Sequence, residues 1–443
     1  MNIFEQLVIP PSSEHIGLLT VMQIISLLTF LPFAGITLGA SVFSVYFKKR
    51  GKSTKNPLYI MMAKDVMDKL TAGKAAGFAL GVLPMITIVL VYAQLLYGAK
   101  VISVSLLTLA LILYIVSYVF IYNYKSAFQL EAVIGALKSG TLPGEVREYE
   151  DKVVYMGSRY GNWGISILLT AMFLFISGMT IASKPGVWSS VDNILKLLVS
   201  APIWVNFLYF LSSSAMVTGG AILYFFFVWQ GGVRPGNLEY AAAIKKYAVI
   251  TAFAGTLIQP IFIFAGTLFL KPYNASSGVY AFAGFSLLAL LLIGAMLYQI
   301  FKSSETNLSG AVFFLIFILF TFTIVKDQLT FKNAMKEQYL VLSSKAEELA
   351  KEKQGMIVQV SGADGEKIFN EKCVACHKFD VKLVGPPYQE TVPKYSGDLK
   401  KLAAFIYNPQ KINPDYPAMP NQGLKQKEAD AVAKYIMDKV GKK

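Results

Sequence analysis

The chain has 443 residues, of which 55% are hydrophobic and only 15% are charged, and its mean hydropathy is +0.51. A soluble globular protein carries about 25% charged residues, so this composition excludes an ordinary soluble enzyme and predicts a membrane protein. The net charge of +14 could indicate nucleic-acid binding, but the basic residues lie in short segments between apolar runs. That pattern is typical of membrane topology, so we expect a lipid bilayer and no nucleic acid as partner.

Eight apolar runs without Asp, Glu, Lys, Arg or His are long enough to cross a bilayer. They cover residues 17–47, 76–97, 102–122, 163–183, 199–229, 247–270, 278–301 and 307–325. They predict an all-α fold with a polytopic bundle of about eight transmembrane helices over residues 1–325. Glycines at four-residue spacing (Gly35 and Gly39, then Gly73, Gly77 and Gly81) predict close helix packing inside this bundle, with a dimer interface as the alternative.

The basic residues are distributed unevenly between the two sides of the predicted bundle. The segments after the first, third, fifth and seventh runs carry seventeen Lys and Arg, whereas those after the second, fourth and sixth carry four. Because cytoplasmic loops are enriched in Lys and Arg, we predict a multi-pass protein of the cell inner membrane with both termini on the periplasmic side. The first 16 residues contain no Lys or Arg, so we expect no cleavable signal peptide.

The membrane half contains few side chains that could bind haem iron or another metal. Its one histidine is His15, which excludes a dihaem cytochrome b or a haem–copper oxidase, and without acids or bases in the runs a proton relay is hard to build. We expect His15 to be an interfacial or capping residue; the alternative is a partner for a quinone or for a haem shared with another subunit. Gln94, beside Tyr92 in the second run, and Gln259 are expected to be satisfied within the bundle, with a quinone contact as the alternative.

After residue 325 the chain becomes polar. Residues 326–353 lack Gly and Pro and predict a helix that continues from the eighth span. The sequence QGMIVQVSGADG at 354–365 then predicts a hinge, so that 326–360 form a helical stalk and hinge. We expect residues 361–443 to form a compact domain. Some 80 residues is small for a stable core, and a covalently held haem would supply an apolar centre.

Both cysteines of the chain lie in the sequence CVACH, as Cys373 and Cys376, with His377 directly after them. This is the pattern of a c-type haem attachment site: two thiols one helical turn apart reach the two vinyl groups, and the imidazole reaches the iron. A zinc site would need two more N or S ligands, and only one further histidine exists. We predict one covalently attached haem c with His377 as an iron ligand.

The sixth position on the iron is either open or filled by a methionine. Met419 lies in the proline-flanked sequence DYPAMPNQG, and a thioether ligand raises the reduction potential and suits electron transfer. Met437, expected in a helix core, and Met356, in the predicted hinge, are the alternatives. We predict that Met419 is the ligand.

Residues 361–443 resemble the small class I cytochromes c of the bacterial c-551/c-552 type. The resemblance is carried by GEKIFNEKCVACH, LVGPPY, PAMP and the final KEADAVAKYIMDKV. It implies that Gly365 and Phe369 of a first helix pack against Tyr435 of the last. It also implies that the carbonyl of Pro386 orients the haem histidine, and that the segment at Tyr407 and Asn408 borders the haem.

Residues 18–47 and 75–98 resemble the first two spans of the large subunit of cytochrome bd-type oxidases, some branches of which are thought to carry a C-terminal cytochrome c. The intramembrane haem-binding histidines of that family have no counterpart here, and Gln23 lies in the region where one is expected. Kinship would therefore imply a chain that has lost those haems and serves as a scaffold.

The sequence as a whole predicts a membrane-anchored monohaem cytochrome. It would transfer single electrons outside the membrane as a subunit of a respiratory or photosynthetic complex, with other membrane subunits and an external redox protein as partners. We expect an electron-transfer subunit rather than a catalyst by itself. The alternatives are a quinol-oxidising or bd-like oxidase subunit, and a redox-sensing transport or signalling protein.

Overall fold

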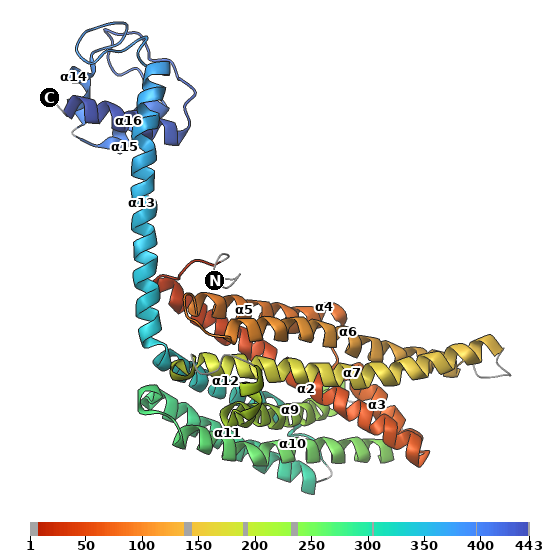
Figure 1. Cartoon of the computed structure of the whole chain (residues 1–443). Coiled ribbons are helices and arrows are strands. Elements are labelled where there is room, and N and C mark those ends of the chain that lie inside the picture. Colours follow the sequence, from red (N-terminus) through yellow and green to blue (C-terminus); the bar gives the residue numbers. More distant parts are fainter. Residues whose placement is uncertain are drawn as a thin grey trace. The chain divides into compact units, whose positions relative to one another are not determined.

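The computed structural model describes residues 8–136, 144–188, 194–231, 238–303, 305–395 and 397–441. Within these ranges every regular element is a helix. The chain divides into two compact units, Met1–Ser343 and Ser344–Lys443. Figure 1 shows the first unit as a bundle of long helices lying side by side.

Eight helical segments of the first unit are long and apolar enough to cross a membrane, which confirms the predicted all-α membrane bundle. They are Ser13–Thr54, Lys74–Leu95, Ser103–Glu131, Glu148–Ala182, Ala201–Phe227, Leu238–Leu268, Ser277–Lys302 and Ser309–Ala334. The helices that contain them are α2 (Ser13–Thr54), α4 (Lys74–Gly77) with the π-helical η1 (Phe78–Val82) and α5 (Leu83–Leu95), α6 (Ser103–Ala136), α7 (Gly144–Ala182), α9 (Ala201–Phe227), α10 (Leu238–Leu268), α11 (Ser277–Lys302) and α12 (Ser309–Ala334).

Several helices run beyond the apolar sequence that predicts them. Helix α2 begins after its N-cap Ser12, whose hydroxyl accepts the N–H of His15 at 3.3 Å, and it continues through Lys48 to Thr54 because Lys and Arg are good helix formers. A further helix, α3 (Pro57–Leu70), follows it. Helix α3 starts with the cap Asn56 and buries one face made of Met, Ala, Val and Leu, whereas the sequence indicated only a basic connection between the first two spans here.

The spaced glycines pack inside the bundle, as predicted. A Cβ on Gly39 would lie 2.7 Å from the Cβ of Thr218 on α9, and a Cβ on Gly77 would lie 2.5 Å from the hydroxyl of Tyr118 on α6. These positions let helix backbones approach closely. The prediction was wrong for Gly73, where a Cβ would meet nothing within 4 Å.

Polar contacts between elements lie at each end of the bundle. At one end the Lys48 Nζ lies 2.8 Å from a carboxylate oxygen of Glu131, joining α2 to α6. At the other end, the Gln338 amide donates to the Tyr97 carbonyl at 3.1 Å. Gln338 belongs to helix α13 (Lys336–Lys372), so the chain leaves the bundle at the end whose connections carry few basic residues.

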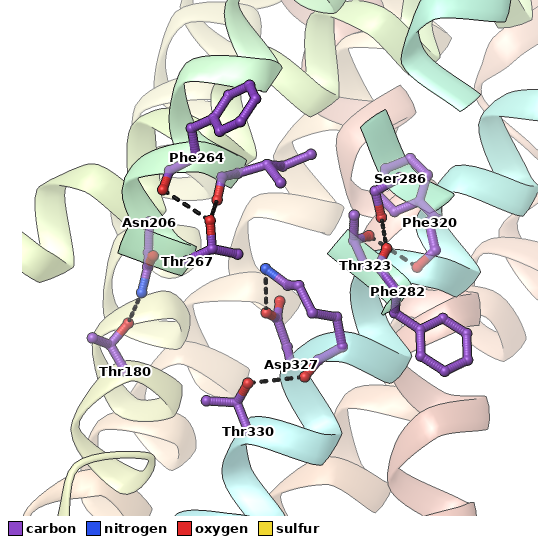
Figure 2. Close-up of polar contacts among 12 residues, drawn as sticks. Thr180, Asn206, Phe264, Thr267, Phe282, Ser286, Phe320, Thr323, Asp327 and Thr330 are labelled. Atoms are coloured by element: carbon purple, nitrogen blue, oxygen red, sulfur yellow. Dashed lines mark hydrogen bonds and ion pairs between the residues drawn. The ribbon is translucent and has the colours of Figure 1, made fainter. Parts of the chain in front are cut away.

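Many hydroxyl groups within the spans donate to carbonyls of their own helices, and others, such as that of Ser214, donate to a carbonyl of a neighbouring helix. Figure 2 shows Thr323, Ser286 and Thr267 donating to carbonyls of the preceding turn, at 2.8–3.1 Å. In lipid every polar group needs such an internal partner. The Lys326–Asp327 ion pair, at 2.9 Å, lies just beyond the predicted apolar run of α12, so these groups serve local structure.

The helix predicted to continue from the eighth span is interrupted at Met335. Helix α12 ends at Ala334, and Met335 (φ −93°, ψ 5°) separates it from α13. The Met335 side chain is fully buried in the bundle core with Leu342. The predicted hinge at 354–365 is helical instead, since α13 runs through it to Lys372; isolated glycines cost a helix about 1 kcal/mol each but do not end it.

The second unit is a small helical domain. After the end of α13 it contains α14 (Tyr388–Thr391), η5 (Val392–Tyr395), α15 (Leu399–Tyr407) and α16 (Gln426–Gly441). Asp398 caps α15 by accepting the N–H of Lys401 at 3.1 Å. The core is formed by Phe369, Cys373, Tyr388, Val392, Leu402, Ala403, Ile406, Leu424, Ala429, Val432, Ala433 and Ile436.

Candidate haem site

The CVACH sequence forms a tight turn where α13 ends. The N–H of His377 and the N–H of Cys376 both donate to the carbonyl of Cys373, at 3.0 and 3.1 Å. Cys373 is only 5% exposed and belongs to the domain core, whereas Cys376 is half-buried. The turn therefore brings both thiols and the imidazole into one short stretch of rigid backbone.

The imidazole of His377 is oriented by the segment that follows. Its Nδ1 lies 3.1 Å from the carbonyl oxygen of Pro386, so an Nδ1–H donates there and Nε2 keeps its lone pair. The Gly385 N–H donates to the Cys376 carbonyl at 2.9 Å and holds this segment in place. A histidine held through one ring nitrogen presents the other to a metal in a defined direction.

Gly385 is required for this close approach. A Cβ at this position would lie 2.7 Å from both ring nitrogens of His377, well inside van der Waals contact. The backbone can pass this close to the imidazole only because glycine has no side chain.

Aromatic rings of the domain core pack together next to the CVACH turn. The ring of Phe369 lies 5.3 Å from that of Tyr435 and 5.8 Å from that of Tyr388. A Cβ on Gly365 would lie 2.8 Å from the carbonyl carbon of Ala431, so α13 and α16 cross with their backbones in contact. The structure thus brings Gly365, Phe369 and Tyr435 together, as the family resemblance implied.

Met419 lies in the long segment between α15 and α16 and is partly buried. Asn421 accepts the N–H of Gly423 at 2.9 Å, and Gly423 adopts φ +68°, which turns the chain into α16. Of the alternative ligands, Met437 packs against the domain core, and the side chain of Met356 lies outside the described residues. Met419 therefore stays the predicted ligand.

Tyr407 is exposed at the end of α15, and Asn408 caps that helix. A contact that the sequence did not indicate joins the segment after His377 to the methionine segment: the Lys382 ammonium lies 4.6 Å from the centre of the Tyr416 ring. No spacing rule connects two residues that are far apart in the chain, so only the fold could reveal it.

The protonation of Cys373 follows from its burial. Burial raises the pKa of the Cys373 thiol to about 11, and the neighbouring Cys376 adds to the increase. In the haem-free chain this group is therefore a neutral thiol at physiological pH.

The residues around the turn fit a haem. Five large apolar side chains of this small domain are 42–71% exposed: Val374, Val381, Leu383, Val384 and Ile412. An apolar macrocycle is the kind of group that such side chains cover. No set of three His, Cys, Asp or Glu side chains in the described residues is placed to hold a bare metal ion, whereas two thiols and one free imidazole nitrogen match a haem c.

The membrane half shows a mixed result for its predicted polar residues. His15 is exposed in the first turn of α2. The Gln259 amide donates to the Met216 sulfur at 3.1 Å, so it is satisfied within the bundle. Among the described residues the side-chain oxygen of Gln94, and both polar atoms of the Gln23 amide, have no hydrogen-bond partner; the expectation was therefore wrong for Gln94.

Comparison with known proteins agrees with this geometry. The cytochrome c family profile matches residues 362–439. The chain is 37% identical over 79 residues to cytochrome c-551 of Pseudomonas aeruginosa, covering 17% of this chain and 75% of that protein. It is 36% identical over 77 residues to cytochrome c-551 of Pseudomonas denitrificans, covering 16% of this chain and 94% of that protein. No solved structure matches.

The second unit thus defines a class I cytochrome c domain, and the bundle supplies eight helices suited to a membrane. Through this domain the chain belongs to the cytochrome c family. Membership implies one covalently attached haem c, electron transfer as its role, and a redox partner. The similarity covers about a sixth of the chain. It identifies the C-terminal domain and gives no information about the function of the transmembrane bundle.

Proposed function

We propose that the chain is a membrane-anchored monohaem cytochrome that transfers single electrons on the outer face of the membrane, as a subunit of a respiratory or photosynthetic electron-transfer complex. The observation that carries the proposal is the held imidazole of His377. Its Nδ1 is engaged by the Pro386 carbonyl at 3.1 Å, and its Nε2 is left for iron, directly after the two cysteines.

Each site residue has one task in this proposal. Cys373 and Cys376 would hold the porphyrin through thioether bonds, His377 would bind the iron through Nε2, and Met419 would bind it through sulfur. When bound, the haem supplies a one-electron iron couple. A thioether ligand favours the reduced iron and raises the reduction potential. The proton stays on Nδ1, where it is donated to the Pro386 carbonyl, so electron transfer requires no proton at the imidazole. With His377 and Met419 both on the iron, the site would have no open position for a substrate and would act as a carrier.

The proposed location, in the cell inner membrane with both termini on the periplasmic side, rests on charge and connectivity. The connections after odd-numbered spans carry seventeen Lys and Arg, against four after even-numbered spans, and cytoplasmic loops favour basic residues. The Gln338–Tyr97 contact supports an exit of α13 at the basic-poor end. A C-terminal fusion to alkaline phosphatase, which is active only outside the cytoplasm, should be active. An inactive phosphatase fusion, together with an active C-terminal fusion to a reporter that works only in the cytoplasm, would refute the topology.

Membership in a larger complex is supported by the size of the bundle. A single transmembrane helix suffices to anchor a small cytochrome, yet this chain has eight candidate spans. We propose that the bundle binds other membrane subunits and that the haem domain exchanges electrons with a protein outside the membrane. Purification in mild detergent, followed by mass spectrometry, should recover other redox subunits in fixed ratio. Recovery of the chain alone as a monodisperse, reducible cytochrome would contradict this.

A second candidate function, a quinol-oxidising or bd-like subunit with a membrane cofactor, is favoured by one observation. Gln23 is fully buried in α2, and its amide meets no group in good hydrogen-bond geometry among the described residues, although the Tyr92 hydroxyl lies close to it. Buried polar groups usually have partners, so a bound group there would account for it. A pyridine haemochrome assay separates the two: haem c alone at one per chain supports the carrier, and additional haem b or d bound by this chain supports the oxidase subunit.

A further inference from the structure

The imidazole of His377 has a planar neighbour in addition to its contacts with Gly385 and Pro386. The ring of Tyr388 lies 5.0 Å from the imidazole, centre to centre, and the two planes are inclined by 29°, a stacked arrangement. Tyr388 is only 8% exposed. The sequence indicated the histidine, its attachment and its carbonyl partner, but nothing in it singled out this tyrosine.

Tyr388 is itself held in a fixed orientation. It opens α14, and its N–H donates to the Lys378 carbonyl at 3.1 Å, directly after the haem histidine. Its ring also lies 5.8 Å from the ring of Phe369 and 5.5 Å from that of Phe379. The phenol ring is therefore part of a packed aromatic core and cannot swing away from the imidazole without disturbing that core.

A fixed plane next to the imidazole narrows a motion that the hydrogen bond restrains only loosely. The Nδ1–H bond to Pro386 holds one ring atom, but hydrogen bonds to carbonyls tolerate a broad range of angles, so the ring can still tilt about the Cβ–Cγ bond. Gly385 adds close backbone contact at the ring atoms, without a side chain that lies parallel to the ring. The stacked ring of Tyr388 adds a planar restraint on this tilt.

We propose that Tyr388 is a positioning residue that sets the plane of the His377 imidazole relative to the porphyrin. The inference rests on the proposed role of His377 as iron ligand. The plane of an axial imidazole determines how its π orbital overlaps with the iron d orbitals. It therefore governs how the unpaired electron of the oxidised iron is distributed over the macrocycle, which the g-tensor measures by electron paramagnetic resonance (EPR).

The test uses the full chain, purified in detergent with haem attached and oxidised. Tyr388→Phe keeps the ring and removes only the hydroxyl, whereas Tyr388→Leu removes the planar contact. Tyr395→Leu is the matched control, because Tyr395 is a partly buried tyrosine of the same domain whose ring packs on Phe405 at 6.2 Å. Tyr388→Met, which refills the space with a flexible side chain, replaces the leucine variant if that variant does not load haem.

We expect the g-tensor of Tyr388→Phe and Tyr395→Leu to match that of the parent. Tyr388→Leu should show a displaced or broadened g-tensor while its iron remains low-spin and six-coordinate. A parent-like g-tensor in a loaded Tyr388→Leu or Tyr388→Met variant would overturn the proposal. So would an equal change in Tyr395→Leu. Failure of both ring-free variants to load haem, with normal loading of Tyr388→Phe, would also overturn it, because the ring would then be needed for folding.

A second measurement separates this proposal from the ligand assignment itself. The chain has two histidines, so pulsed EPR of His15→Gln protein labelled with ¹⁵N-histidine reports on His377 alone. Strong ¹⁵N coupling to the iron establishes the ligand, and a parent-like Tyr388→Leu spectrum would then refute only the positioning role. Absence of that coupling would refute the proposed ligation, whatever the Tyr388 variants show.

Discussion

Replacing Gly385 by alanine is the sharpest perturbation that the site offers. The added methyl carbon would lie 2.7 Å from both ring nitrogens of His377, whereas ordinary contact begins at 3.4 Å. The Cε1 atom of the same imidazole would be nearer still, so the imidazole or the backbone must shift by more than about 0.7 Å. The Nδ1 of the same ring lies 3.1 Å from the Pro386 oxygen, so a shift of this size away from the carbonyl would break that hydrogen bond.

Two costs add in this variant. Overpacking in a tight site costs about 1–3 kcal/mol, and the lost hydrogen bond adds about 1 kcal/mol. We therefore expect Gly385→Ala to destabilise the haem domain by about 2–4 kcal/mol and to weaken the bond between His377 and iron. Gly441→Ala is the control, because a Cβ there meets nothing within 4 Å.

The assay is denaturant unfolding of the oxidised full chain in detergent, followed by the haem Soret band and by the low-spin EPR signal. Gly385→Ala should unfold at clearly lower denaturant than Gly441→Ala, and a fraction of its iron should be high-spin before unfolding. If both variants unfold together with the same spin state, the imidazole is not held against Gly385 and the account of the site is wrong.

Three further predictions address other parts of the molecule. Met419→Ala should abolish the weak long-wavelength absorption of a methionine–ferric iron bond, whereas Met437→Ala should retain it; survival of the band in Met419→Ala would assign the ligand elsewhere. In the haem-free chain the raised pKa of Cys373 means that its folded-state contribution to stability is complete below pH about 9 and is lost as pH rises towards about 11. Thiol alkylation should therefore modify Cys373 slowly at pH 8 and faster above pH 10, and a constant rate would contradict this. Lys48→Met should destabilise the bundle by about 3 kcal/mol by leaving the Glu131 carboxylate without its partner. Thermal unfolding should show part of this loss restored in Lys48→Met with Glu131→Gln, and equal stability of single and double variants would contradict the pairing.

The bundle could be predicted from sequence because lipid imposes a simple rule on composition. Eight uncharged apolar runs gave eight candidate spans, but their ends and irregularities depend on tertiary contacts. The amphipathic α3 was missed because its buried face opposes other helices rather than lipid. The π-helical turn at Phe78–Val82 lies where tyrosine hydroxyls of α6 pack closely on Gly77 and Gly81. The local sequence does not predict such a contact between two helices.

Some features of the haem site could likewise be predicted from the sequence, and others could not. CVACH carries its chemistry in its spacing, so the attachment residues and His377 could be predicted directly, and the Pro386 contact followed from the family resemblance. The close approach of Gly385 and the stacking of Tyr388 could not, because both depend on how a loop folds back onto the imidazole. The hinge predicted at 354–365 took its glycines as a break, and α13 runs through these residues as a helix.

One haem c, attached through Cys373 and Cys376 on the C-terminal domain, is proposed as the redox centre of this chain. Intact-mass spectrometry of the purified chain, combined with a pyridine haemochrome assay, measures whether this is so. We expect one covalent haem per chain, lost when both cysteines are replaced by alanine, and no haem retained by the bundle. A chain that purifies without covalent haem yet still exchanges electrons, or a double cysteine variant that keeps a bound haem, would contradict it.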